Sequence, residues 1–143
     1  TAARDELAEL WSRAGLPSSD GLVSIDAPER DSAEAIGDVV SLGGFAYSWH
    51  DGPGDSLVRG CDAVVVERNC WSEELIVTIQ QKREGTSGAP IFLLLNFPLP
   101  GDVIAARHAG ATAVMGKPFT LGEFLGQLQN VVTANRSLRL DAA

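Results

Sequence analysis

The stretch Asp62-Ala63-Val64-Val65-Val66-Glu67 is a run of four apolar residues, three of them valine, with a carboxylate at each end. Valine favours β-strands, and a strand that is apolar on both faces is expected where helices cover a sheet on both sides. Similar short β-rich runs lie at residues 22–25, 45–49, 91–95 and 112–115. We therefore expect residues 63–66 to form one of five strands in a buried sheet.

Segments with the apolar spacing of amphipathic helices separate these runs, at residues 30–41, 73–84, 102–109 and 121–134. In the second segment, for example, Leu75, Ile76 and Ile79 would face inward. A shorter segment, residues 55–59, would supply the remaining crossover helix. Strands that alternate with helices are typical of an α/β domain with a parallel sheet.

Composition sets limits on the partners of this domain. The chain has 143 residues, 45% of them hydrophobic and 21% charged, which is enough for one globular domain with a core. Its formal net charge of −8 argues against direct contact with nucleic acid, because phosphate binding needs a basic patch. Its longest apolar run is about five residues, far below the roughly 20 that span a bilayer. We expect neither a nucleic acid nor a membrane as a direct partner.

The two cysteines indicate a reducing, cytoplasmic setting. Cys61 and Cys70 flank the strand at residues 63–66. An extended chain of that length would hold them on the order of 25 to 30 Å apart, too far for a disulfide. Two separate thiols are ordinary in a cytoplasmic protein.

A longer motif around the fifth run, Gly110-Ala111-Thr112-Ala113-Val114-Met115-Gly116-Lys117-Pro118-Phe119, resembles the signature of response-regulator receiver domains. Weaker matches are Asp26-Ala27-Pro28-Glu29 after the first strand, His50-Asp51-Gly52 after the second, and Pro90 before the fourth. The resemblance covers roughly residues 21–134. It implies the flavodoxin-like receiver fold, with three layers and a five-stranded parallel sheet of order 2-1-3-4-5 between helices.

The two ends of the chain lie outside this resemblance. Residues 3–14 place Leu7, Leu10 and Trp11 on one face of an additional N-terminal helix. We therefore divide the chain into an N-terminal helix and linker (1–20), a receiver-like domain (21–134) and a C-terminal tail or linker (135–143).

The resemblance also implies that the phosphorylation site is degenerate. Receivers hold magnesium with two adjacent acids and a phosphoacceptor aspartate; here Ile25 and Asp26 stand at the acids and Glu67 at the acceptor. Magnesium prefers several oxygen ligands in octahedral geometry, so the loss of one carboxylate should make its binding weak or absent. We expect no other cofactor and no metal.

The residues that transmit phosphorylation in the family are also changed. The hydroxyl residue that ends the fourth strand is replaced by Leu95, followed by Asn96, and the aromatic switch residue is Val114. Lys117, with the Pro118 that follows it, is retained. A permanent Glu67–Lys117 ion pair would imitate the phosphorylated state only in part, because a phosphoryl group carries about −1.5 to −2 charge and three acceptor oxygens. We therefore expect a domain fixed in one conformation.

These residues predict a phosphorylation-independent pseudo-receiver, not an enzyme, in a hybrid histidine kinase or an atypical response regulator. It would act by contact with a protein partner, an output domain, other domains of its own chain or a second copy, through the surface of residues 102–134. One alternative is a small-ligand sensor whose pocket involves Asp26, Glu67, Asn96 and Lys117. Another is a phosphoacceptor receiver with a non-standard site, and Glu67 as a solvated strand-end carboxylate also remains open.

Overall fold

The computed structural model describes residues 21–50, 61–86 and 88–142, and five parallel strands form its sheet. Their order is β2-β1-β3-β4-β5, as predicted. Each strand overlaps its predicted apolar run and differs from it by at most two residues at either end. The strands are β1 (Leu22–Asp26), β2 (Ala46–His50), β3 (Ala63–Arg68), β4 (Ile91–Asn96) and β5 (Ala113–Lys117).

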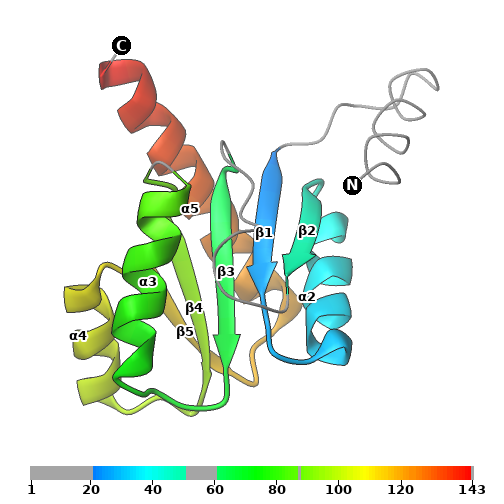
Figure 1. The fold of residues 1–143 in the computed structure, drawn as a ribbon. Helices are drawn as coiled ribbons and strands as arrows, with labels where there is room; N and C mark the ends of the chain where they lie inside the picture. The colour runs from blue at the N-terminus through cyan, green and yellow to red at the C-terminus, as the bar shows by residue number, and fades with distance from the viewer. Residues whose placement is uncertain (1–20, 51–60, 87, 143) are drawn as a thin grey trace.

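Helices cover both faces of this sheet (Figure 1), as expected for strands that are apolar on both sides. The helices are α2 (Arg30–Leu42), α3 (Glu74–Gly85), α4 (Pro100–Ala109) and α5 (Leu121–Ala142). Helices α2 and α5 pack on one face, where Ile36, Phe92 and Phe124 belong to one apolar core. Helices α3 and α4 pack on the other face, where Ile79, Leu93 and Ala106 belong to a second core.

Two helices extend beyond their predicted bounds by two residues or more. Helix α4 begins at Pro100, and the Asp102 carboxylate accepts a hydrogen bond from the Leu99 backbone N–H at 3.0 Å, which caps its first turn. Helix α5 continues to Ala142, so residues 135–142 of the expected tail or linker are helical. Arg136 on this added part pairs with Asp62 at 3.3 Å, which ties the helix to the sheet.

Some predictions fall outside the described residues, namely the N-terminal helix and linker of residues 1–20, the short helix of residues 55–59 and the Asp51-Gly52 match. None of the helices within the described ranges is long and apolar enough to cross a membrane.

Candidate functional site

Parallel register brings the predicted site residues to one edge of the sheet. Asp26 lies opposite Val66 on the neighbouring strand, and Glu67 follows directly at the end of β3. Asn96 and Lys117 lie opposite each other at the ends of β4 and β5. This is the edge where open parallel sheets place their functional residues.

Glu67 is a buried carboxylate with one engaged oxygen and one orphaned oxygen. The residue is 3% exposed, and its Oε1 forms an ion pair with the Lys117 ammonium. The Glu67–Lys117 pair expected from the sequence is therefore present. Its Oε2 is buried and has no hydrogen-bond partner among the described residues. The alternative that Glu67 is a solvated strand-end carboxylate is wrong.

Asp26 is held by two other cations, neither of which was predicted at the site from the strand ends. Its Oδ1 lies 3.1 Å from a guanidinium nitrogen of Arg68, and its Oδ2 lies 3.0 Å from the Lys82 ammonium. Lys82 comes from the last turn of α3 and is only 3% exposed. The Lys117 pair is with Glu67, so the two carboxylates are paired by three different cations.

Arg68 also joins the ends of the two central strands. The nitrogen that faces the Asp26 carboxylate donates to the backbone carbonyl of Asp26 at 3.2 Å and to that of Glu67 at 2.8 Å. Carbonyl and carboxylate oxygens are the ligands that magnesium prefers. At this edge they are occupied by a guanidinium group.

The site therefore carries its own positive charge. Arg68 and Lys82 both pair with Asp26, which leaves one formal positive charge in excess around that carboxylate, whereas Lys117 and Glu67 balance each other. A charge balance of this kind opposes the entry of a divalent cation. Within the described part of the chain, no group of three or more His, Cys, Asp or Glu side chains is placed to hold a metal ion.

The other predicted positions lie in the cores or on the surface. Ile25 is fully buried in the core under α2 and α5, because successive side chains of a strand point to opposite faces. Leu95 is buried in the core under α3 and α4, and Val114 packs against that core. Asn96 and Pro118 are exposed. The changes at Ile25 and Leu95 thus place apolar core residues where the family has polar groups.

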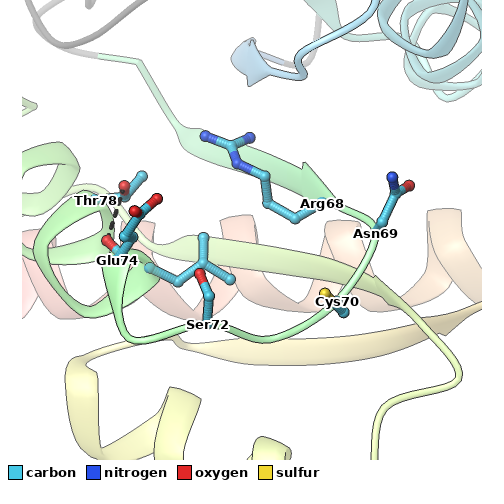
Figure 2. Close-up of a pocket in the computed structure, with 7 residues that line it drawn as sticks. Arg68, Asn69, Cys70, Ser72, Glu74 and Thr78 are labelled. Carbon is cyan, nitrogen blue, oxygen red and sulfur yellow. Dashed lines mark hydrogen bonds between the residues drawn. The ribbon is translucent and has the colours of Figure 1, made fainter.

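An open pocket of about 280 Å³ lies beside the site, between the end of β3 and the first turns of α3 (Figure 2). Its lining residues are Arg68, Asn69, Cys70, Ser72, Glu74, Leu75 and Thr78. None of the four residues expected to form a ligand pocket, namely Asp26, Glu67, Asn96 and Lys117, lines this pocket.

The sequence indicates that Lys82 is buried, although Lys82 does not lie at a strand end. Lys82 follows Leu75 and Ile79 at helical spacing, so it lies on the buried face of α3. A lysine on an apolar helix face needs a buried carboxylate as its partner. Arg68 had no comparable signal, because the residue after a strand-end glutamate is ordinarily solvated.

Comparison with solved structures finds this fold in response regulators. One from Thermotoga maritima matches with a TM-score of 0.68 and 20% identity, over 78% of this chain and 97% of that one. An orphan response regulator of H. pylori gives 0.67 and 15%, over 81% and 99%. A Francisella receiver domain gives 0.68 and 15%, over 81% and 99%. No protein-family model and no curated protein matches the sequence. The chain therefore has the fold of response-regulator receiver domains.

Proposed function

We propose that this chain is a pseudo-receiver signalling domain of a two-component system that works without phosphorylation. The observation that carries the proposal is Glu67, which is buried at the acceptor position with one oxygen paired to Lys117. Phosphoryl transfer needs an accessible attacking oxygen, a metal ion and donors that stabilise the transferred group. At this site the carboxylate is covered, and the neighbouring Asp26 is neutralised by Arg68 and Lys82.

The same features support a domain that holds one conformation. In a switch, a ligand or modification must favour one of two arrangements of the site. Here Glu67 is already paired with the ammonium group of Lys117, which belongs to the same chain. Leu95 and Val114 stand at the positions of the hydroxyl and aromatic switch residues. The output would then depend on where and when the domain is present, and the domain itself would have no enzymatic activity.

A surface for a partner is available on α4 and α5. Ile104 is 59% exposed and Leu121 is 46% exposed, and both lie within the expected interaction surface of residues 102–134. A contiguous exposed apolar patch marks a protein contact, and we propose that these two side chains contribute to one. We propose a protein partner, such as a histidine kinase, an output domain or another domain of the same chain, or a second copy, in the cytoplasm, with no direct contact to nucleic acid or membrane.

Treatment with acetyl phosphate or phosphoramidate and magnesium, followed by intact-mass analysis, tests the proposal. We expect no mass gain in the wild-type chain. Glu67→Asp, which shortens the side chain by one methylene, tests whether an acceptor aspartate alone restores the reaction. Glu67→Gln serves as the control that removes the carboxylate. A gain of one phosphoryl group in the wild type that is lost in Glu67→Gln would refute the proposal and favour a conventional receiver.

The small-ligand alternative receives less support. Three of its four expected residues, Asp26, Glu67 and Lys117, are committed to ion pairs. The pocket beside the site is lined by a different set of side chains, including Arg68 and Glu74, which carry opposite charges.

A further inference from the structure

Arg68 uses only one of its three guanidinium nitrogens within the described residues. Its Nη1 donates to the backbone carbonyls of Asp26 at 3.2 Å and Glu67 at 2.8 Å, and lies 3.1 Å from Asp26 Oδ1. The Nε and Nη2 atoms have no partner in the described part of the chain. Together they form a planar fork of N–H donors that matches a carboxylate group. The bonds at Nη1 hold this fork in place, and the side chain is 28% exposed, so a ligand can reach it.

The pocket beside the site places Arg68 and a free carboxylate around one space. Arg68 and Glu74 both line this pocket of about 280 Å³. In Figure 2 the Arg68 side chain extends from β3 toward the side of the pocket that Glu74 and Thr78 of α3 form. The two charged groups make no ion pair with each other, and the Glu74 carboxylate has no ion pair within the described residues. Two free charges of opposite sign therefore border the same pocket.

The size and lining of the pocket narrow the class of ligand. Its volume lies at the lower end of the range for small-molecule pockets, which suits a molecule smaller than a typical drug. Asn69 and Ser72 add an amide and a hydroxyl group, and Leu75 adds an apolar surface. An anion without a positive charge would be repelled by Glu74, and a cation without a negative charge would be repelled by Arg68. A molecule that carries both charges avoids both penalties.

We propose that this pocket binds a small zwitterion of the α-amino-acid type. Its carboxylate would contact the Nε and Nη2 atoms of Arg68, and its ammonium group would contact the Glu74 carboxylate. This inference goes beyond the proposed function and does not depend on it, because neither Glu67 nor Lys117 lines the pocket. Arg68 also bonds the carbonyl groups of Asp26 and Glu67, so the ligand and the ends of β1 and β3 would share one side chain.

Saturation-transfer difference NMR tests the proposal with L-alanine, L-serine and L-leucine as probes. Propionate and ethylamine are the comparison probes, because each carries only one of the two charges. We expect at least one of the three amino acids to bind saturably. Propionate and ethylamine should bind at least about fivefold more weakly than that amino acid, since each loses one ionic contact.

Three variants assign the binding to this pocket. Arg68→Lys keeps the charge but removes the planar fork, and should weaken binding of the amino acid by about tenfold. Glu74→Gln should weaken it by about two- to fivefold, because Glu74 is exposed and solvent screens its charge, and should not weaken binding of propionate. Glu73→Gln is the matched control and should bind like the wild type, because it removes the same charge from the adjacent exposed position, which does not line the pocket.

The proposal is overturned if none of the three amino acids binds saturably up to about 10 mM. Equal binding by the wild type, Arg68→Lys and Glu74→Gln would place the ligand elsewhere and overturn it as well. Propionate that binds as tightly as the amino acids would overturn the role of Glu74. If Arg68→Lys fails to fold, the surface variants Glu74→Gln and Glu73→Gln still decide the question. Phosphorylation of the wild-type chain would count against the proposed function alone.

Discussion

At the level of single residues, Asp26 and Lys82 form a buried ion pair whose two halves depend on each other. Breaking such a pair by removal of one partner costs about 3–5 kcal/mol, because the remaining charge stays in a poorly hydrated environment. Asp26 keeps Arg68 at 3.1 Å, so Lys82→Met belongs at the lower end of that range. We expect Lys82→Met to lower the free energy of unfolding by about 3 kcal/mol, measured by urea denaturation.

Two further variants distinguish the stability contribution of the Asp26–Lys82 pair from the general effect of removing a charge. Arg83→Met, on the exposed side of the same helix turn, should change the free energy of unfolding by less than about 0.5 kcal/mol. Asp26→Leu combined with Lys82→Met removes both buried charges and should recover much of the loss, because Arg68 is partly exposed and can be hydrated. Strictly additive losses in this cycle would contradict the buried-pair account.

The sequence predicted part of this site and missed the rest for a physical reason. Glu67 and Lys117 follow apolar strands of a parallel sheet, so topology alone places them at one edge. Lys82 lies in the last turn of α3 and not at a strand end, and its side chain reaches Asp26 along the face of the sheet. Contacts of that kind depend on how far a helix lies from the strands, which a single sequence does not state.

At the level of elements, the packing of α2 on β2 depends on a residue without a side chain. Gly37 is buried within α2, and a Cβ atom built there would lie 2.4 Å from the ring of Tyr47 on β2. Gly126, within α5, has no atom within 4 Å of such a Cβ. Glycine in a helix interior is less favourable than alanine by about 1 kcal/mol, so only the contact with Tyr47 distinguishes the two sites.

We therefore expect Gly126→Ala to raise the free energy of unfolding by up to about 1 kcal/mol. The free energy of unfolding of Gly37→Ala should be about 1–3 kcal/mol lower than that of Gly126→Ala, because the added methyl group forces the Tyr47 ring or the helix to move. Urea denaturation of both variants gives this difference. In a Tyr47→Ala background, where the ring is absent, most of the difference between the two glycine variants should disappear. If Gly37→Ala and Gly126→Ala had equal effects in the wild-type background, the contact between Gly37 and Tyr47 would be loose.

Strand positions were predictable because each strand is a short apolar run that must be covered on both faces. The ends of the helices were harder to predict from the sequence. The predicted end of α5 at residue 134 relied on the last inward-facing apolar residues, yet no glycine or proline follows before residue 142, and the Arg136–Asp62 pair fastens the added turns. At α4 the cap is supplied by Asp102, inside the helix, so the helix begins two residues earlier than its amphipathic pattern.

At the level of the whole molecule, two apolar cores share one sheet. One core lies under α2 and α5 and the other under α3 and α4, and alternate residues of β3 and β4 belong to each. Val65, for example, lies in the first core, whereas Val64 and Val66 lie in the second. Neither core can be lost while the other keeps its strands, so the described parts of the chain should unfold in one cooperative step.

The chain carries a natural probe of each core, which makes this cooperativity measurable. Trp49 packs against the first core and donates its indole N–H to the Ala27 carbonyl at 3.1 Å, while Trp71 packs against the second core. In variants that keep only one of the three tryptophans, both probes should give the same urea midpoint. Leu128→Ala in the first core and Ile79→Ala in the second should each cost about 2–5 kcal/mol and shift both probes equally. If Leu128→Ala moved the midpoint at Trp49 and left that at Trp71 unchanged, the two faces would be separate units.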